Sequence, residues 1–282
     1  MDDSATAQTA APAETLKPRS ELRDTISFLV KLVILVFIVR SFVFAPFSIP
    51  SGSMLPRLLV GDYLFITKWN YGYSKHSLPW SLPLIPGRIF AKDPARGDVV
   101  VFKAPPDAKT DWIKRVIGVP GDTVQMRGGQ LILNGQAIPK QRVADFVLPM
   151  TPNAECDADT LETAADGTAV CRIPRYRETL PGGKSYDVLD SGPTTGDDTQ
   201  VFTVPAGHVF LMGDNRDNSA DSRFEPVMDS TGTNRGGIRF VPMENIQGKA
   251  VVNFWSTDGS AQWVLPWTWF SAARFERIGE GF

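Results

Sequence analysis

The feature that most constrains this chain is a long apolar segment near its beginning. From Ile26 to Phe47 the sequence is dominated by Phe, Leu, Val and Ile, and these 22 residues are enough for a helix to cross a bilayer core of about 30 Å. Lys31 and Arg40 interrupt the segment, and their long side chains can snorkel toward a membrane surface. We therefore predict a transmembrane helix over residues 25–46; an amphipathic helix lying in the interface is the alternative.

The flanks of this segment predict its orientation. Residues 1–24 are polar and rich in Ala and Thr, which indicates a disordered tail, and they contain three Lys or Arg residues. The 16 residues from Pro46 to Gly61 contain only Arg57. The positive-inside rule then keeps the N-terminus cytoplasmic and places the body outside. A cleaved secretory signal competes with this interpretation, because Val43-Phe44-Ala45 resembles a small-x-small cleavage site.

The composition of the remaining chain favours short strands and turns. The sequence has 22 Pro and 24 Gly, and Asn134-Gly135 is a strong hairpin signal. Further strands are predicted within residues 98–102, 112–119, 238–242 and 248–255. The pattern predicts a mainly β body rather than alternating strands and helices. A net charge of −2 does not indicate a basic surface for binding a nucleic acid. The chain has two Cys and no CxxC motif, so we expect no metal site and no other cofactor.

A serine stands where the apolar segment ends. Ser53 lies between Gly52 and Met54, and prolines on both sides stiffen the backbone, so Ser53 is a candidate nucleophile. Its hydroxyl needs a base. The two histidines, His76 and His208, lie in segments typical of structural histidines.

Lys114 is the better candidate base. It lies in the apolar, strand-like run that ends at the Pro120-Gly121-Asp122 turn. If its side chain faces inward, desolvation lowers its pKa from about 10.4 toward a value that suits a general base. A Ser-Lys pair is a known variant of the catalytic triad. A solvated surface lysine is the alternative.

A third stretch supports the pair. Residues 213–223 are dense in polar and charged side chains directly after the apolar residues 209–212. Together with Pro50-Ser51-Gly52-Ser53-Met54, residues 96–102 and residues 114–122, this stretch resembles the bacterial type I signal peptidases, which are Ser-Lys endopeptidases of the inner membrane. The four motifs stand in the family's order.

The resemblance implies a function and a mechanism. Ser53 would attack the scissile carbonyl of an exported pre-protein, and Lys114 would accept the proton. The Ser53 N–H and the Ser51 hydroxyl would hold the oxyanion, and Ser219 would orient Lys114. A charged scaffold would hold the two catalytic strands in register, and its members would be Asp214, Arg216, Asp221 and Arg223. The alternative is that these residues form an ion-pair network on the surface.

The substrate would bind as an added strand and fill two shallow pockets that accept small side chains. Two residues depart from the family pattern: Arg57 replaces a common threonine, and Trp112 replaces a common tyrosine, which leaves the pocket preference open. The family also implies that proline after the scissile bond blocks cleavage, so Pro46 would protect the chain from itself. The expected substrate-binding residues are Phe47, Ile49, Pro50, Met54, Leu58, Trp112 and Ile113.

The resemblance also implies a domain arrangement. The catalytic β domain would comprise residues 47–122 and 201–282, and a smaller β domain would be inserted at residues 123–200. Cys156 and Cys171 lie in the insertion, and in an oxidising compartment they are expected to form a disulfide, with two free thiols as the alternative. The aromatic residues around Trp80 and after Trp263 fit either lipid headgroups or a protein core.

The predicted setting is the bacterial inner membrane, with one span and the catalytic domain on the periplasmic side. Signal peptides of exported pre-proteins and the bilayer are the expected partners, and an association with the translocation machinery is left open. Two other classes of protein share parts of this pattern. A self-cleaving Ser-Lys regulator would need a DNA-binding domain and no anchor, whereas an inactive membrane-anchored binding protein would lack a member of the catalytic set.

Overall fold

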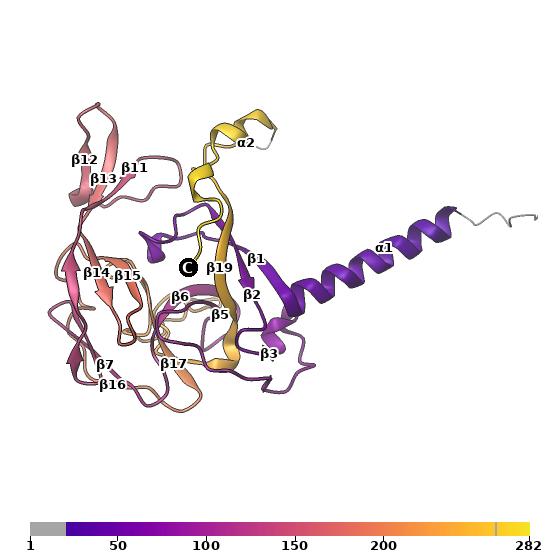
Figure 1. The fold of residues 1–282 in the computed structure, drawn as a ribbon, viewed down its shortest axis with the longest axis horizontal. Helices are drawn as coiled ribbons and strands as arrows, with labels where there is room; N and C mark the ends of the chain where they lie inside the picture. Colours follow the sequence, from indigo (N-terminus) through magenta and orange to yellow (C-terminus); the bar gives the residue numbers. More distant parts are fainter. Residues whose placement is uncertain (1–20, 263) are drawn as a thin grey trace, which may run out of the picture. The chain divides into compact units, whose positions relative to one another are not determined.

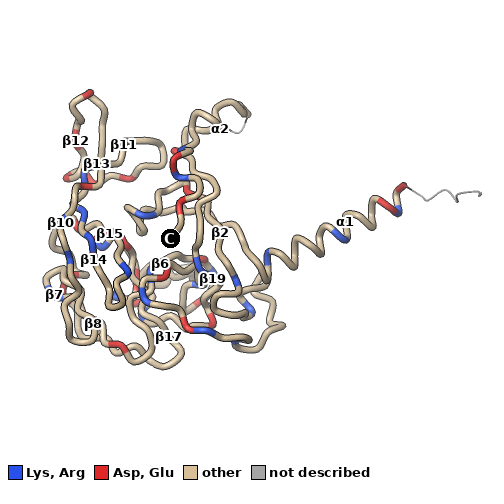
Figure 2. Tube along the Cα trace, in the orientation of Figure 1, with Lys and Arg blue, Asp and Glu red and all other residues tan. Residues whose placement is uncertain are grey.

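The computed structural model describes residues 21–262 and 264–282, and these fall into two units that divide after Ile38. The first unit contains helix α1, Glu21–Ile38, whose apolar side chains are exposed and whose charged positions are sparse (Figure 2). A short π-helical turn, Val39–Val43, continues it. By length and composition, Glu21–Val43 is a helix able to cross a membrane, and among the described residues it is the one such helix.

The helix differs from its prediction at both ends. It begins at Glu21, so the last residues of the predicted 1–24 tail form the first helical turn instead; residues 1–20 lie outside the described residues. The helical conformation ends at Val43, so residues 44–46 of the predicted span lie in strand β1, Phe44–Ser48. The physical reason is Pro46, which lacks an N–H and disfavours a helical conformation at the preceding residue.

The largest element of the second unit is an antiparallel sheet of seven strands (Figure 1). Its order is β1-β2-β19-β5-β6-β17-β18, so the first strand and the last strand both pair with β2 near one edge. Strand β1, which carries Pro46, is an edge strand, where a missing N–H is tolerated. The other strands are β2 (Asp62–Thr67), β5 (Val99–Lys103), β6 (Asp111–Gly118), β17 (His208–Met212), β18 (Phe240–Pro242) and β19 (Ile246–Ser256).

Smaller sheets follow between β6 and β17. One has the order β16-β7-β8-β9, with β7 (Thr123–Arg127), β8 (Gln130–Leu133), β9 (Gln136–Ala137) and β16 (Phe202–Thr203). A second joins β10 (Lys140–Arg142), β14 (Arg175–Thr179) and β15 (Ser185–Leu189). A third joins β11 (Phe146–Pro149), β13 (Ala169–Ile173) and β12 (Leu161–Thr163). The remaining strands, β3 (Tyr73–Ser74) and β4 (Arg88–Ile89), form a two-stranded sheet. Short 3₁₀ turns and helix α2 (Trp267–Ser271) lie between and after the strands.

The mainly β prediction is confirmed, and so are several of its elements. Strands β5, β6, β18 and β19 lie where strands were predicted. Asn134 and Gly135 form the predicted two-residue hairpin: both have positive φ, and β8 pairs with β9 across them.

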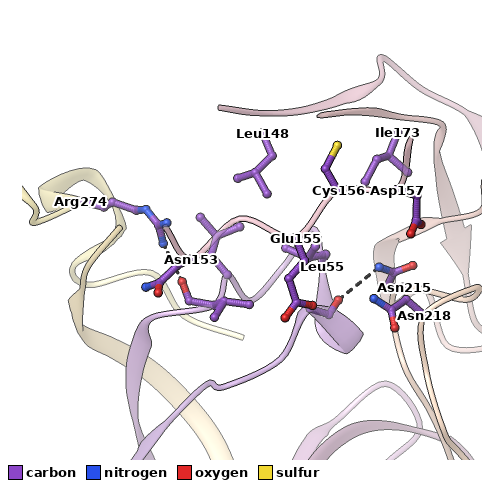
Figure 3. Close-up of a pocket in the computed structure, with 13 residues that line it drawn as sticks. Leu55, Leu148, Asn153, Glu155, Cys156, Asp157, Ile173, Asn215, Asn218 and Arg274 are labelled. Atoms are coloured by element: carbon purple, nitrogen blue, oxygen red, sulfur yellow. Dashed lines mark hydrogen bonds between the residues drawn. The ribbon is translucent and has the colours of Figure 1, made fainter. Parts of the chain in front are cut away.

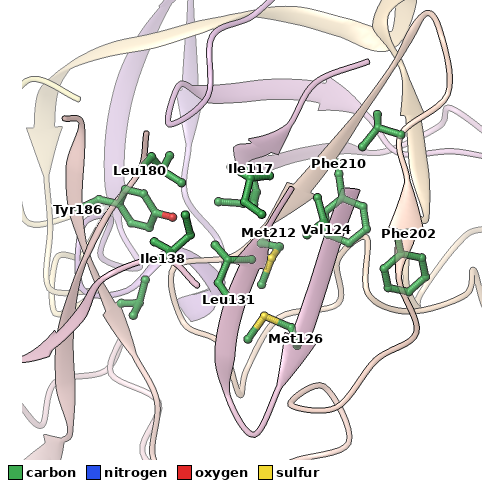
Figure 4. Packing of buried hydrophobic residues seen from close by; sticks show 13 residues of the cluster. Ile117, Val124, Met126, Leu131, Ile138, Leu180, Tyr186, Phe202, Phe210 and Met212 are labelled. Atoms are coloured by element: carbon green, nitrogen blue, oxygen red, sulfur yellow. The ribbon is translucent and has the colours of Figure 1, made fainter. Parts of the chain in front are cut away.

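One hydrophobic cluster spans the predicted domain boundary (Figure 4). It packs Ile117 and Phe210, from the seven-stranded sheet, against Val124, Leu131 and other residues of the 123–200 region. Contacts group residues 39–282 as one unit. The two regions therefore share a hydrophobic core. The division into a catalytic domain and an inserted domain stays a prediction.

Candidate active site

Ser53 lies in a single turn of 3₁₀ helix, Gly52–Met54, shortly after β1. Hydrophobic packing fixes this turn because Met54 and Leu58 are fully buried in one cluster with Ile49. The backbone is also tied to the loop after β17: the N–H of Asn215 donates to the Ser53 carbonyl at 3.1 Å, and its side-chain Nδ2 donates to the Gly52 carbonyl at 3.3 Å. The serine is thus held on two sides.

Lys114 lies in the middle of β6, paired with Val100 of β5. Its Nζ is 2.7 Å from the Ser53 Oγ and 3.1 Å from the Ile113 carbonyl oxygen. The residue is 4% exposed, and burial lowers its pKa to about 8, although Asp221 and Asp214 act in the opposite direction. A substantial fraction of Lys114 is therefore neutral at mildly basic pH, which is the state that accepts a proton.

Within the described part of the chain, the side-chain hydrogen bonds of the two histidines involve neither Ser53 nor Lys114. His76 is buried, its pKa is lowered to about 4 by burial, and its Nδ1 contacts the Ser81 Oγ at 2.9 Å. The His208 Nδ1 contacts the Ala206 carbonyl oxygen at 3.0 Å. Neither contact brings an imidazole to the serine.

Ser51 and Ser219, the two supporting serines, are placed differently. The Ser51 Oγ is 3.5 Å from the Ser53 Oγ, on the exposed side of the turn. The Ser219 Oγ is buried and has no hydrogen-bond partner among the described residues, so the expected bond to Lys114 is not made in this structure. Ser219 nevertheless lies close by, because a methyl group on Gly213 would meet both the Ser219 Oγ, at 2.3 Å, and the Ser53 carbonyl oxygen, at 2.5 Å.

The predicted charged scaffold is buried rather than exposed. Asp221 accepts two hydrogen bonds from the Arg223 guanidinium, each 2.9 Å, and two from the backbone N–H groups of Gly213 and Arg223, each 3.1 Å. Burial alone would raise the pKa of Asp221, but these contacts with Arg223 and Gly213 hold it below its usual range. The alternative of a solvated surface network is wrong for these residues, since both are almost completely buried.

Three further residues complete this scaffold, and the sequence analysis missed them. Arg115 forms a two-point ion pair with Asp214 at 2.7 and 2.6 Å. Glu178, in β14, pairs with Arg216 at 3.0 and 2.5 Å. Tyr186, in β15, donates to Glu178 at 2.9 Å and stacks under the Arg115 guanidinium, 4.4 Å from the ring centre.

The sequence does contain a signal for Arg115. It follows Lys114 in a strand, where alternate side chains point to opposite faces, so a charge beside the candidate base needs its own partner. Glu178 carried no such signal. Its partner is 38 positions away, and only the folded topology brings the β14–β15 hairpin to the loop after β17.

Most predicted substrate residues gather in one cluster. Ile49 and Ile113 are buried there, and Phe47 packs against it. Trp112 packs in a different cluster, and its ring centre is 5.5 Å from the Lys114 Nζ. Pro50 is exposed.

Arg57, the other departure from the family pattern, contacts the end of the chain. Its guanidinium donates to the Gly281 carbonyl and lies 5.4 Å from the centre of the Phe282 ring. Neither contact involves the serine or the lysine, so the substitution leaves the candidate dyad untouched.

A pocket beside the nucleophile turn is lined in part by residues of the 123–200 region (Figure 3). Its lining residues include Gly52 and Leu55 from the turn, Asn215 from the loop after β17, and Glu155 and Cys156 from the 123–200 region. Cys156 forms a disulfide with Cys171, with Cα atoms 5.7 Å apart. The disulfide loop therefore lines a pocket next to the candidate site.

Known proteins resemble this chain over most of its length. The sequence model of the family described as signal peptidase, peptidase S26, matches residues 22–255. A signal peptidase I of Rickettsia typhi is 33% identical over 265 residues, covering 88% of this chain and 89% of that protein. The protein of the same name from Rickettsia akari is 35% identical, with 88% of each chain covered. A solved signal peptidase I from Enterococcus faecalis is 22% identical and covers 56% of this chain and 97% of that one, with a TM-score of 0.27 that is too low for comparing folds.

The buried serine and lysine on a β scaffold, together with these matches, define the class as serine endopeptidases. Within that class, the chain belongs to the signal peptidase family, peptidase S26.

Proposed function

We propose that this chain removes signal peptides from exported pre-proteins with Ser53 as nucleophile and Lys114 as general base. Family membership supports the activity, and the 2.7 Å contact between the Ser53 Oγ and the Lys114 Nζ supports the assignment of roles. The contact is short enough for direct proton transfer, and it lies in a site where burial disfavours the ammonium form.

The reaction follows from this geometry. The Ser53 Oγ attacks the scissile carbonyl carbon while its proton moves to the neutral Lys114 Nζ, giving a tetrahedral oxyanion. The backbone N–H of Ser53 and the Ser51 hydroxyl stabilise that oxyanion. Lys114 then protonates the leaving amine, and the C–N bond breaks to leave an acyl-enzyme. Water, deprotonated by the same lysine, hydrolyses the ester and frees Ser53.

The substrate binds as an extended strand beside residues 47–53 and 111–114. Strand β1 is at the edge of its sheet, and an edge strand offers unpaired backbone groups to an added strand. Phe47, Ile49 and Ile113 shape the pockets from one side, while the buried Met54 and Leu58 support them from below. Trp112, next to the base, shapes the opposite wall.

The protein is anchored in a membrane through the helix that begins at Glu21. We propose that its N-terminus is cytoplasmic and that residues 47–282 lie on the periplasmic side of the inner membrane. The basic residues before the apolar segment support this orientation. The disulfide between Cys156 and Cys171 also fits an oxidising compartment.

Cleavage of a model pre-protein with an Ala-x-Ala site tests the assignment. The full chain is compared in detergent with Ser53→Ala and Lys114→Met, and circular dichroism checks that each variant is folded. Wild type should cut after the second Ala, and both variants should be inactive. Cleavage by folded Lys114→Met would place the base elsewhere, and an inert wild type would favour an inactive binding protein.

A further inference from the structure

A second pocket lies within the second unit, and one of its lining residues, Arg40, is close in sequence to the end of the apolar segment. Four of the residues that line it are cationic, namely Arg40, Lys68, Lys103 and Lys109. Asp111 is the one carboxylate among its lining residues. We call this site the basic pocket. None of the roles assigned to Ser53, Lys114 or the charged scaffold uses these four side chains.

Lys68 is the member of the basic pocket that most needs a partner. It is 3% exposed, and its Nζ donates one hydrogen bond, of 3.5 Å, to the Ser77 carbonyl. Within the described parts of the chain, no carboxylate oxygen is recorded within 4.0 Å of that nitrogen. Burial lowers the pKa of Lys68 to about 8. A buried ammonium with one long hydrogen bond is costly unless an anion satisfies it.

The other charges do not neutralise the basic pocket. Asp111 pairs with Lys103 at 2.9 Å and also accepts a hydrogen bond from Gln247. The Lys109 Nζ donates to the carbonyls of Thr231 and Gly232, which orient it but carry no charge. Four cations therefore face one carboxylate that is already engaged, and the excess positive charge favours an anionic ligand.

The position of the basic pocket in the chain indicates the source of that anion. Arg40 belongs to the apolar stretch Glu21–Val43, three residues before its end, where a spanning helix leaves the hydrocarbon core. Trp80, another lining residue, is 90% exposed, and Leu84 nearby in the chain is 72% exposed. A large exposed indole is typical of the headgroup region. The earlier alternative, in which Trp80 packs in the core, is wrong.

We propose that the basic pocket binds the phosphate of an anionic phospholipid headgroup, with Lys68 as its central ligand and Arg40 and Lys109 at its rim. A bound phosphate would give Lys68 the partner that the protein does not provide. It would also hold the body against the bilayer near Phe47, which lines the same pocket. Phe47 begins the segment 47–53, beside which the substrate is proposed to bind.

Lipid binding can be measured without catalysis. The full chain carrying Ser53→Ala is placed in nanodiscs of phosphatidylcholine with or without phosphatidylglycerol, and the lipids nearest the protein are counted by quenching tryptophan fluorescence with spin-labelled forms of each lipid. The parent protein should prefer phosphatidylglycerol. Each removed cation should weaken that preference about fivefold, as expected for one basic charge near an anionic surface.

The variants are Lys68→Met and Lys109→Gln, with Lys75→Met as matched control. Lys75 lies near Lys68 in sequence and is paired with Glu244 at 3.9 Å, but it does not line the basic pocket. Because Lys109 is exposed, Lys109→Gln keeps the test valid if Lys68→Met fails to fold. The proposal is overturned if both variants fold and keep the phosphatidylglycerol preference of the parent protein. It is also overturned if Lys75→Met loses as much of that preference as the two variants do.

Two further measurements separate other occupants. Glycerol phosphate should compete weakly with the lipid; if it or inorganic phosphate binds the protein in detergent as tightly as the lipid does, a free phosphate site replaces the lipid site. If Lys68→Met of the active enzyme raises KM for the pre-protein equally in detergent and in both kinds of nanodisc, the occupant is the substrate and the lipid proposal fails.

Discussion

The Glu178 carboxylate and the Arg216 guanidinium form a buried two-point ion pair that joins strand β14 to the loop after β17. Both residues are at most 2% exposed, and the same loop places Asn215 against the Ser53 carbonyl. The 123–200 region therefore takes part in holding the candidate site.

Glu178→Gln should destabilise the protein by about 3–5 kcal/mol, because it leaves the buried Arg216 charge without its partner. Chemical denaturation of the purified protein measures this. The matched control is Glu162→Gln, which breaks an exposed pair with Arg172 and should cost at most about 1 kcal/mol. Equal losses in the two variants would show that the Glu178 pair has no special role.

Activity should rise with pH until Lys114 is mostly neutral. Burial lowers the pKa of Lys114 from 10.5 to about 8, so kcat/KM should fall about tenfold per pH unit below that value and level off above it. The same shift acts on stability. Between about pH 8 and the ordinary lysine pKa the unfolded chain binds more protons at this site, so this site makes stability rise with pH there.

Measuring kcat/KM for a pre-protein substrate across this pH range checks the predicted dependence of activity on pH. Measuring the free energy of unfolding of wild type and Lys114→Met across the same range checks the predicted dependence of stability on pH. In Lys114→Met, the contribution of this site to the increase of stability above pH 8 should be absent. A flat rate profile through pH 8 would contradict a lysine base with this pKa.

Gly213→Ala should impair both folding and activity. The added methyl would lie 2.3 Å from the Ser219 Oγ and 2.5 Å from the Ser53 carbonyl oxygen, so the serine turn must move. Overpacking of this kind costs about 1–3 kcal/mol. The control is Gly281→Ala, where the new methyl meets its nearest neighbour at 3.4 Å. Wild-type kcat in Gly213→Ala would show that Ser53 tolerates the displacement.

Pro46→Ala should expose the chain to cleavage after Ala45 by other copies of the enzyme. The resemblance predicts that proline after the scissile bond blocks cleavage there. The strand pairing of Pro46 with Phe65 would give a second protection. N-terminal sequencing of the purified variant should find a new start at residue 46, which should disappear when Ser53→Ala is added. An intact Pro46→Ala chain would show that the sheet alone protects this bond.

The sequence predicted what local patterns control. The apolar run, the Asn134-Gly135 turn and the apolar strands β5 and β6 each follow from residues close together in the chain, so they could be located in advance. Ser53 and Lys114 were predicted as the catalytic pair because the motifs that contain them stand in the order of the family they resemble. The β14–β15 hairpin could not be anticipated as a support, because the partnership of Glu178 and Tyr186 with the site depends on contacts between distant segments. Ser219 shows the converse, since its motif position was recognised but its expected hydrogen bond is not formed here.

The shared cluster of Figure 4 limits how this protein can be redesigned. Ile117 and Phe210 are covered by side chains such as Leu131 from the 123–200 region, so removing that region would strip the back of the seven-stranded sheet and expose it to water. A shortened enzyme cannot be made by joining residue 122 to residue 201 alone. It would need new polar residues on the uncovered face, and a grafted insertion from a relative would have to bring a matching hydrophobic surface with it.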